Sequence, residues 1–564
     1  MSCSPHKKAF KLQRNIFLTL KHEATLLLGK PPQAILKYER ENEKDFRNKK
    51  PFRNIPKSEL IDEIRKVDVT FIGDFHTLDQ AQRTALRIMR EVIRPDETWW
   101  IGLELVPTQF QKELDALQAG KISVESFLQA IHYEEAWGFP WPHYAPIFEW
   151  ARQNQVKLIA LNRPQAFVLP SEDEDLHKRD QWAAGVITDL FTTDLFTDQK
   201  PKMLVLYGEL HVGSRHLPAH LEQISKAFLK SPLTWITLHQ NNDKLYWEMA
   251  KKNLQANILS LKPRTYCVFS STPWAKLQSI ISWVEGGFLS HSERETDYYS
   301  IISDFVKTLS EFLGVPIPQT EPMSVYTLDQ LDHLGDGLES LRTKAGFSQE
   351  ENQLIKFYIK TNQPFYLSKK GFAYLGTPSF NRAAEMSAIH LFQSALPIEP
   401  YFKRDRTSFC SCLLESTFGF FGSLILNPRR KCDLPADHQV RISQLEAGTA
   451  PQFPKEAQAR KLVLGLLKSQ SLHEMDQQLK FKNMTPLVCM TARYLGQIFG
   501  KTLYECMIGS SARPGATKNK KVEISKIRQL FLEKDPARSV EHRAQELMEL
   551  VFPIPIESSK SDRI

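Results

Sequence analysis

The stretch Val67-Asp68-Val69-Thr70-Phe71-Ile72-Gly73-Asp74-Phe75-His76 has the same form as a later one, Lys202-Met203-Leu204-Val205-Leu206-Tyr207-Gly208-Glu209-Leu210-His211. Each is an apolar, β-prone run followed by glycine, an acid, one apolar residue and histidine, and a helix-like stretch comes next. This order predicts a strand, a sharp turn and a helix, and glycine suits the turn because it has no Cβ. Ligands of open α/β sheets bind at the carboxyl ends of the strands. We therefore expect both histidines to reach the same edge of one sheet.

Predicted strands and helices alternate between residues 55 and 285. Apolar residues recur at helical spacing between the strands, for example in Leu78–Ile93. Strands that alternate with crossover helices predict an α/β fold, with a mainly parallel sheet and helices on both faces. The expected strands are Val67–Ile72, Trp99–Leu103, Val156–Leu161, Leu204–Tyr207, Leu233–Leu238 and Tyr266–Phe269.

The second half of the chain predicts a mostly α-helical domain. The apolar stretch Cys410–Leu426 is interrupted by Glu415 and predicts a buried helix rather than a membrane span. One small hairpin is expected from Phe365–Leu367 and Gly371–Leu375, and no catalytic motif is recognisable. Other expected helices are Tyr298–Leu313, Leu328–Leu341, Glu350–Tyr358, Asn381–Leu396 and Met484–Ile508. The predicted domains are a basic N-terminal helix and linker (1–54), the α/β domain (55–285) and the helical domain (290–564).

The composition is that of a globular protein with ordinary hydrophobic cores. Of the 564 residues, 42% are hydrophobic and 24% charged, and the net charge is +8. The basic residues are mostly scattered, so nucleic acid is not an expected partner. Seven cysteines without a C-x-x-C pair argue against a disulfide framework or a zinc ribbon. No signal peptide is recognisable, which predicts a cytoplasmic protein; the alternative is a membrane-anchored lipoprotein whose start lies upstream of Cys3.

Polar residues come at the ends of four predicted strands: His76, Glu104, Asn162 and His211. Arg179 opens the helix before the fourth strand and is expected at the same edge. Histidine supplies a neutral nitrogen ligand or a base near neutral pH, and glutamate supplies an oxygen ligand or a general acid–base group. Two histidines and one carboxylate can hold a divalent metal and leave positions open. Without a metal, the same set can activate water as a general base.

Each of these residues also has an ordinary structural interpretation. A single histidine at a strand end is more often a hydrogen-bonded structural residue than a ligand, and Glu104 can simply pair with Arg179. Three polar residues at the ends of apolar strands together favour a functional site. Asp74 and Glu209, each two residues before a histidine, are further ligands or groups that orient the imidazoles. The catalytic candidates are His76, Glu104, Arg179 and His211, and the metal-ligand candidates are His76, Glu104, Glu209 and His211.

The same segment resembles the haem-binding uptake proteins of the ChaN type, within the Tiki/TraB/erythromycin-esterase superfamily. The resemblance covers about residues 60–240. The residues that carry it are Gly73-Asp74-Phe75-His76, Leu103-Glu104, Gln109, Leu114-Asp115, Gly120-Lys121-Ile122-Ser123, Trp137, Tyr144-Ala145-Pro146, Ala160-Leu161-Asn162, Arg179-Asp180 and Gly208-Glu209-Leu210-His211.

The resemblance implies a haem- or iron-binding protein, because ChaN-like members are linked to haem or iron acquisition. The alternative it implies is a metal-dependent hydrolase, a peptidase or esterase like the Tiki and erythromycin-esterase members, using His76, Glu104 and His211. An aromatic loop that contains histidine and tyrosine could line a haem face, since both residue types ligate haem iron. The candidate cofactor-binding residues are Tyr144, His143 and Asn162.

The expected cofactor is therefore haem or a divalent metal ion. The expected partner is haem, or a small-molecule or peptide substrate. A homodimer and a peripheral association with membranes are compatible with this interpretation. A third hypothesis is a non-catalytic scaffold whose helical half binds a partner.

Overall fold

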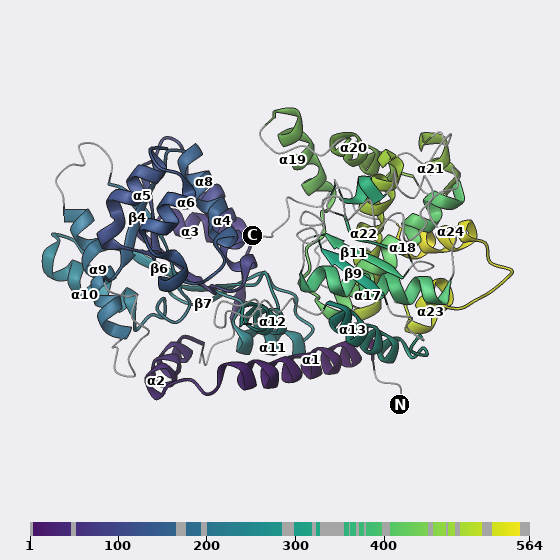
Figure 1. The fold of residues 1–564 in the computed structure, drawn as a ribbon, viewed down its shortest axis with the longest axis horizontal. Helices are drawn as coiled ribbons and strands as arrows, with labels where there is room; N and C mark the ends of the chain where they lie inside the picture. The colour runs from purple at the N-terminus through teal and green to yellow at the C-terminus, as the bar shows by residue number, and fades with distance from the viewer. Residues whose placement is uncertain are drawn as a thin grey trace. The chain divides into compact units, whose positions relative to one another are not determined.

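The chain forms two compact units (Figure 1). The α/β unit consists mainly of residues 17–296, and the helical unit of residues 1–16 and 297–561. The computed structural model describes residues 4–46, 52–164, 176–192, 200–284, 298–318, 323–327, 355–359, 361, 363–367, 371–376, 379–396, 406–448, 455–469, 472–479, 486–509 and 522–552.

The centre of the α/β unit is an eight-stranded sheet. Its strands are β1 (Arg53–Asn54), β2 (Val69–Asp74), β3 (Trp99–Pro107), β4 (Lys157–Asn162), β5 (Lys202–Gly208), β6 (Trp235–Gln240), β7 (Ile258–Lys262) and β8 (Thr265–Val268). They lie in the order β1-β7-β8-β6-β2-β5-β3-β4. All pairs are parallel except those of β7 with β1 and β8 at one edge. The predicted mainly parallel sheet is confirmed.

Successive residues of the central strands enter two separate cores, one on each face of the sheet. In β5, Leu204 and Leu206 belong to one core, whereas Met203 and Val205 belong to the other. Because both faces are buried, the strands read as continuous apolar runs in the sequence. The first core is covered by α3 (Lys57–Arg65), α4 (Asp79–Val92), α5 (Gln111–Gln118), α6 (Val124–Ala130) and α8 (Trp141–Gln153), and the second by α9 (Leu176–Thr192) and α10 (Leu217–Phe228) (Figure 1).

All strands predicted for this unit are present, within a few residues of the expected positions. The sequence analysis missed β1 and β7. β1 has only two residues, both exposed, so it carries no hydrophobic pattern. The unit also contains η2 (Thr108–Phe110), α7 (Tyr133–Ala136), α11 (Asp243–Lys251) and α12 (Pro273–Trp283).

The N-terminal residues are more ordered than predicted. α1 (Pro5–Leu28) contains the expected helix, but α2 (Gln33–Asn42) and η1 (Glu43–Phe46) occupy much of the predicted linker. The charged composition of this stretch gives no indication that one of its faces is buried. Asp45 Oδ1 accepts a hydrogen bond of 2.6 Å from Lys262 Nζ, which fixes η1 to β7. The buried residues of α2 and η1 are Tyr38, Asn42, Asp45 and Phe46.

The core of the helical unit is α18 (Arg406–Leu426), which packs against α17 (Phe380–Ala395) and α22 (Pro486–Ile508). Small residues allow the close approach: a Cβ on Gly496 of α22 would lie 2.7 Å from the Cβ of Ser416. Among the described helices, α18 alone is long and apolar enough to cross a membrane, and that stretch is entirely buried within the unit. This agrees with the buried helix predicted for Cys410–Leu426.

A small sheet in the order β10-β11-β9 accompanies these helices. It contains the predicted hairpin, and the third strand, parallel to β11, was missed. The predicted helix Leu328–Leu341, most of Glu350–Tyr358 and the boundary at 285–290 lie outside the described residues. The remaining elements are α13 (Tyr298–Leu313), β9 (Ser324–Thr327), β10 (Phe365–Leu367), β11 (Phe372–Gly376), α19 (Pro435–Glu446), α20 (Glu456–Leu466), α21 (Leu472–Leu479), α23 (Ile524–Phe531) and α24 (Val540–Val551).

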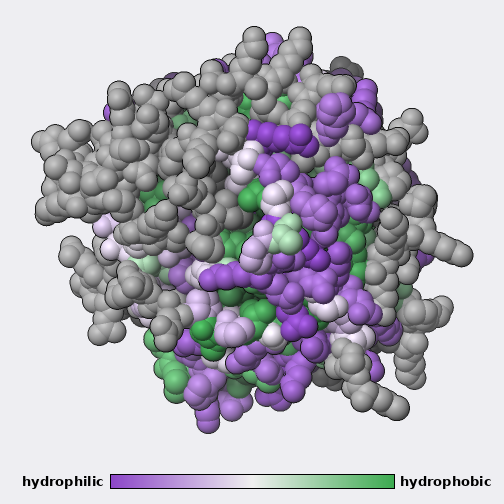
Figure 2. Space-filling view, turned by 90° about the vertical axis from the view of Figure 1, so that its right-hand side faces the viewer, coloured by the Kyte–Doolittle hydropathy of each residue, from purple (hydrophilic) through white to green (hydrophobic). Residues whose placement is uncertain are grey.

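Hydrophilic residues cover most of the coloured surface on the face shown in Figure 2, and hydrophobic residues appear there in small separate areas. Small, separate apolar areas are ordinary on a soluble surface. This face of the molecule therefore offers no large apolar patch among the coloured residues.

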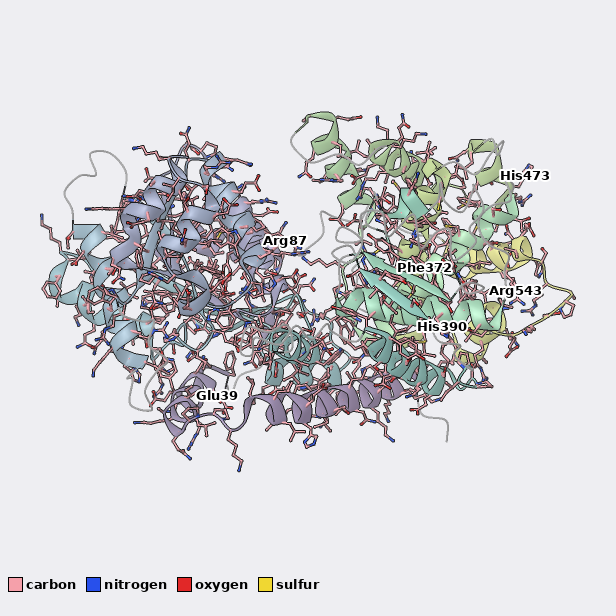
Figure 3. The ribbon with its side chains drawn as sticks, viewed as in Figure 1. Glu39, Arg87, Phe372, His390, His473 and Arg543 are labelled. Atoms are coloured by element: carbon pink, nitrogen blue, oxygen red, sulfur yellow. The ribbon has the colours of Figure 1, made fainter. Side chains whose placement is uncertain are left out.

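One buried histidine of the helical unit makes its stability sensitive to acid. His390 lies on α17 (Figure 3), is 3% exposed and contacts the Tyr366 ring at 5.1 Å between centroids. Neither of its ring nitrogens has a hydrogen-bond partner among the described residues. Burial lowers the pKa of His390 to about 4. The native unit therefore holds this ring neutral, whereas the unfolded chain protonates it below about pH 6.5.

Gly102→Ala should destabilise the α/β unit by roughly 1–3 kcal/mol, the usual cost of overpacking. A Cβ on Gly102 in β3 would lie 2.7 Å from Met203 Cε and also overlap Leu161. Gly185→Ala in α9 is the matched control: its Cβ meets nothing within 4 Å, so a gain of roughly 0.5–1 kcal/mol is expected. Tryptophan fluorescence during urea unfolding measures both, because all ten tryptophans lie within residues 17–296. Equal effects of the two variants would contradict the packing described.

His390→Met should make the helical unit more resistant to acid. Stability from the neutral ring is complete above the unfolded pKa and is lost as pH falls from about 6.5 towards the folded value of about 4. Each pKa unit corresponds to about 1.4 kcal/mol of the free energy of unfolding. The wild type should therefore lose up to roughly 3 kcal/mol on acidification, and the variant should avoid this loss. Hydrogen exchange of α17 at pH 7 and pH 4.5, followed by mass spectrometry, measures it. His473→Met, at an exposed position of α21 (Figure 3), is the control and should leave the acid dependence of α17 unchanged.

Candidate functional site

The carboxyl ends of β2, β5 and β3, which are neighbours in the sheet, bring three predicted residues together. His76 follows β2 and His211 follows β5, as expected. Glu104 was expected to end its strand, but β3 continues to Pro107. The pairing of β3 with β4 is irregular between Leu103 and Pro107, so Glu104 sits where the regular ladder is interrupted. Such irregularities often redirect a side chain next to a functional site.

The three side chains meet over the backbone of Gly208. A Cβ placed on Gly208 would lie 3.2 Å from Glu104 Oε2, 3.3 Å from His211 Cδ2 and 3.5 Å from His76 Nε2. The Gly208 N–H donates a hydrogen bond of 2.6 Å to Glu104 Oε2. Glycine here therefore allows two imidazoles and a carboxylate to approach the same point of the main chain.

His76 is held by a buried carboxylate. Its Nδ1 lies 2.9 Å from Asp74 Oδ2, which also accepts a hydrogen bond of 2.8 Å from the Tyr144 hydroxyl. Asp74 Oδ1 accepts a bond of 2.6 Å from Gln82 Nε2. Burial lowers the pKa of His76, but the hydrogen bond and charge of Asp74, with the charge of Glu104, outweigh it and leave this pKa raised. His76 Nε2 lies 3.9 Å from Glu104 Oε2, beyond hydrogen-bond distance.

His211 is held in the same way by Asp180, with 2.7 Å between its Nδ1 and Asp180 Oδ1. The Tyr38 hydroxyl donates to Asp180 Oδ2 at 2.5 Å and lies 2.9 Å from His211 Nδ1. Burial lowers the pKa of His211 to about 3 and raises the pKa of Asp180 to about 7. Both shifts disfavour charge on these groups, so the buried ring stays neutral at physiological pH and suits metal ligation.

Glu104 is fully engaged by other groups. Its Oε1 accepts a hydrogen bond of 2.6 Å from Arg179, while its Oε2 accepts the Gly208 N–H. Arg179 also reaches Asn162 Oδ1 at 3.4 Å, so the predicted Arg179 and Asn162 both lie at this edge. The side chains of Glu104 and Arg179 are 4% and 17% exposed, so the ion pair is largely shielded from water.

Half-buried aromatic rings flank His76. The ring centroids of Trp137 and Phe139 lie 4.5 Å and 4.7 Å from that of His76. Phe139 in turn stacks on Trp283 of α12 at 4.9 Å. His143 Nδ1 lies 3.3 Å from the His76 carbonyl oxygen, so this predicted residue also lies beside the site. The result is an apolar wall next to a partly exposed imidazole.

Two predicted residues have other contacts than the ones expected. The Tyr144 side chain is 1% exposed and its hydroxyl donates to Asp74, so in this arrangement it supports His76 rather than facing a ligand. Glu209 accepts hydrogen bonds of 3.2 Å from Lys276 through both carboxylate oxygens. A role for Glu209 as a metal ligand stays a prediction.

The sequence analysis missed Tyr38, Gln82 and the close approach at Gly208. Tyr38 belongs to α2, which was assigned to a charged linker, and its only local signal is one buried face on a short helix. Gln82 lies one helical turn into α4, eight residues from Asp74, and no local pattern marks it as a partner of that carboxylate.

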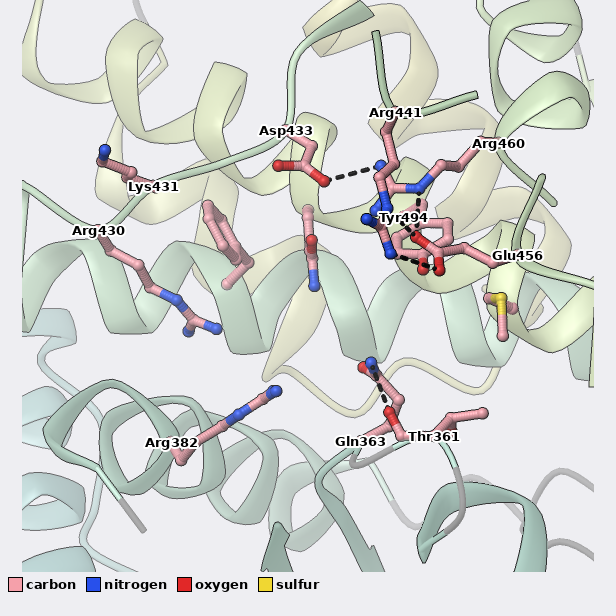
Figure 4. Close-up of a pocket in the computed structure, with 13 residues that line it drawn as sticks. Thr361, Gln363, Arg382, Arg430, Lys431, Asp433, Arg441, Glu456, Arg460 and Tyr494 are labelled. Atoms are coloured by element: carbon pink, nitrogen blue, oxygen red, sulfur yellow. Dashed lines mark hydrogen bonds and ion pairs between the residues drawn. The ribbon is translucent and has the colours of Figure 1, made fainter. Parts of the chain in front are cut away.

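The helical unit has a pocket of about 450 Å³ with a different chemistry (Figure 4). Arg460 donates to Glu456 at 2.9 Å and to Asp433 at 2.8 Å, and Arg441 donates to Glu456 at 3.0 Å. This lining is mainly polar and charged, unlike the aromatic wall beside His76. The charged residues that line it are Arg382, Arg430, Lys431, Asp433, Arg441, Glu456 and Arg460.

Asp74→Asn should lower the pKa of His76, because only the charge of Glu104 is then left to offset the effect of burial. The raised pKa means that the pair stabilises the fold at low pH and that this stabilisation is lost as pH rises through the folded pKa. Titration of ¹³C-labelled histidines by NMR measures the shift. Asp79→Asn, on the half-exposed partner of Arg83, is the control. A His76 pKa unchanged by Asp74→Asn would refute the pairing.

Comparison with known proteins finds a similarity over part of the α/β unit. Residues 60–185 match the family model described as "Haem-binding uptake, Tiki superfamily, ChaN". A solved structure titled "Cofacial heme binding to ChaN of Campylobacter jejuni" is similar at 13% identity and a TM-score of 0.25, covering 34% of this chain and 92% of that chain. No curated protein matches. Residues 60–185 of the α/β unit are therefore similar to the ChaN-type haem-binding uptake proteins of the Tiki superfamily.

Proposed function

We propose that the α/β unit binds haem, with the Nε2 atom of His76 as ligand to the iron. The observation that carries the proposal is the state of this imidazole. Its Nδ1 is held by Asp74, its side chain is 22% exposed, and its Nε2 lies 3.9 Å from Glu104 Oε2 and has no hydrogen bond within the described part of the chain. The family match over residues 60–185 supports a cofactor of this class.

The surroundings of His76 fit a haem. Iron of haem is commonly held by a histidine nitrogen, and a carboxylate on the other ring nitrogen fixes the tautomer and raises the basicity of the ligand. The neighbouring Trp137 and Phe139 rings provide apolar area against which a flat macrocycle can pack. The bound group would supply the iron chemistry; the residues of the chain bind it, orient it and limit access of water.

In this proposal, Tyr144 and Gln82 position the carboxylate that holds the ligand. Both donate hydrogen bonds to Asp74, and each is buried, so Asp74 keeps its orientation without water. His143 would contact the edge of the group rather than replace His76, because its Nδ1 faces the main chain of His76.

The alternative function is hydrolysis with a divalent metal held by His76, Glu104 and His211. The convergence of these side chains over Gly208 favours it. Against it stands the state of Glu104, whose two oxygens already accept hydrogen bonds from Arg179 and Gly208. A water molecule or metal ion would have to share the Glu104 oxygens with these two donors, so we favour binding over catalysis. A cytoplasmic location, a homodimer and an association with membranes stay predictions.

His76→Ala should weaken haem binding by at least about 10-fold, since it removes the ligand nitrogen. Titration of the purified full chain with haemin, followed in the Soret region, measures it. Tyr144→Phe should leave the position of the Soret band unchanged, because its hydroxyl contacts Asp74 and not the iron. His22→Ala on the exposed side of α1 is the matched control.

Haem binding of unchanged affinity in His76→Ala would contradict the proposal. If the wild-type chain binds no haem and its divalent metal content depends on His76 and His211, the hydrolase alternative is favoured instead.

A further inference from the structure

A second cluster of metal-ligating side chains lies on α9 and α10, away from the aromatic wall. His177 and Asp180 lie three residues apart on α9, and His220 lies on α10. One potential ligand atom from each of the three lies within 4.8 Å of the others. The distance from His177 Nδ1 is 3.5 Å to His220 Nε2 and 3.9 Å to Asp180 Oδ2.

These distances are close to those around a bound ion. Zinc bonds of about 2.0–2.1 Å to histidine nitrogens in a tetrahedral arrangement place two such nitrogens about 3.4 Å apart. The two imidazole nitrogens, which are at hydrogen-bond distance from each other, lie 3.5 Å apart, close to this value, and Asp180 Oδ2 lies 3.9 Å from His177 Nδ1. Two imidazoles and one carboxylate are a ligand set used for divalent transition metals.

Neighbouring groups orient the ligands in the way that metal sites require. His177 Nε2 lies 3.5 Å from Glu41 Oε2, which favours a proton on Nε2 and leaves Nδ1 facing the cluster. The Tyr38 hydroxyl donates to Asp180 at 2.5 Å and fixes that carboxylate. Tyr38 and Glu41 lie three residues apart on α2, so one face of this helix supports His177 and Asp180.

The cluster combines buried and accessible members. Asp180 is fully buried, whereas the side chain of His177 is 38% exposed, so an ion can enter and keep a water ligand. His216 stacks on Tyr38 at 3.7 Å and its Nε2 lies 3.5 Å from Glu41, which adds a further imidazole behind the supporting carboxylate. Three imidazoles and two carboxylates rarely gather at one place on an ordinary packed surface, because burying polar groups costs free energy.

We propose that the α/β unit binds a divalent transition-metal ion through His177 Nδ1, His220 Nε2 and Asp180 Oδ2. This site is distinct from the haem site proposed at His76 and does not depend on it. The other carboxylate oxygen of Asp180 is hydrogen-bonded to His211. An ion on Asp180 would hold α9 against α10 and fix the carboxylate that orients His211.

The test uses the full-length chain, stripped of metal, with Co²⁺ as the probe. Equilibrium dialysis counts the bound ions, and the visible absorption of Co²⁺ reports nitrogen and oxygen ligands in a low-coordinate site. The double variant His177→Gln/His220→Gln should lose one equivalent of Co²⁺ and its visible band. His76→Ala and the exposed control His22→Ala should both keep that equivalent.

Glu41→Gln supplies a second variant that removes no ligand. It should weaken Co²⁺ binding by about 10-fold to 100-fold, the usual effect of losing a group that orients a ligand. Tryptophan fluorescence during urea unfolding shows whether each variant is folded. The proposal is overturned if the wild-type chain binds no Co²⁺, or if the double variant and Glu41→Gln bind as the wild type does. If the wild-type chain binds no haem but still binds the Co²⁺ equivalent, only the function proposed at His76 is refuted.

Discussion

The candidate site depends on two buried carboxylates that hold the Nδ1 atoms of two histidines. A buried carboxylate without partners is strongly unfavourable, and each of these also accepts a hydrogen bond from a tyrosine hydroxyl. Nδ1 is occupied in both imidazoles, and His76 Nε2 and His211 Cδ2 are the ring atoms that lie nearest to a Cβ placed on Gly208. The two sets are Asp74, His76 and Tyr144, and Asp180, His211 and Tyr38.

The two halves of this arrangement differ in charge. The pKa of His76 is raised because, although burial lowers it, Asp74 and Glu104 outweigh that effect. The pKa of His211 is lowered to about 3, with burial as the largest cause. One edge of the sheet therefore carries one histidine with a raised pKa and another with a lowered pKa. This separation is a feature of functional sites, where environments move the pKa values of neighbouring groups apart.

Packing around Asp180 ties the N-terminal helix α2 to the edge of the sheet. Tyr38 reaches Asp180, while Asn42 donates hydrogen bonds of 2.9 Å and 3.2 Å to the carbonyl oxygens of Glu209 and Leu210. The turn that carries His211 is thus fixed by a segment distant in the sequence. The contact of Tyr38 with Asp180 also supports the cluster proposed for a metal ion, so α2 contacts both the His211 turn and that cluster.

The sequence by itself determined the α/β class, the strand positions and the delivery of His76, Glu104 and His211 to one edge, because apolar runs and the carboxyl ends of parallel strands are local signals. It also indicated the buried helix at Cys410–Leu426. Only the tertiary structure decided which groups those residues contact. The partnership of Tyr38 with Asp180, the engagement of Glu104 by Arg179 and the meeting of His177 with His220 join elements far apart in the chain. No local pattern encodes such contacts, since they arise from helix packing on a completed sheet.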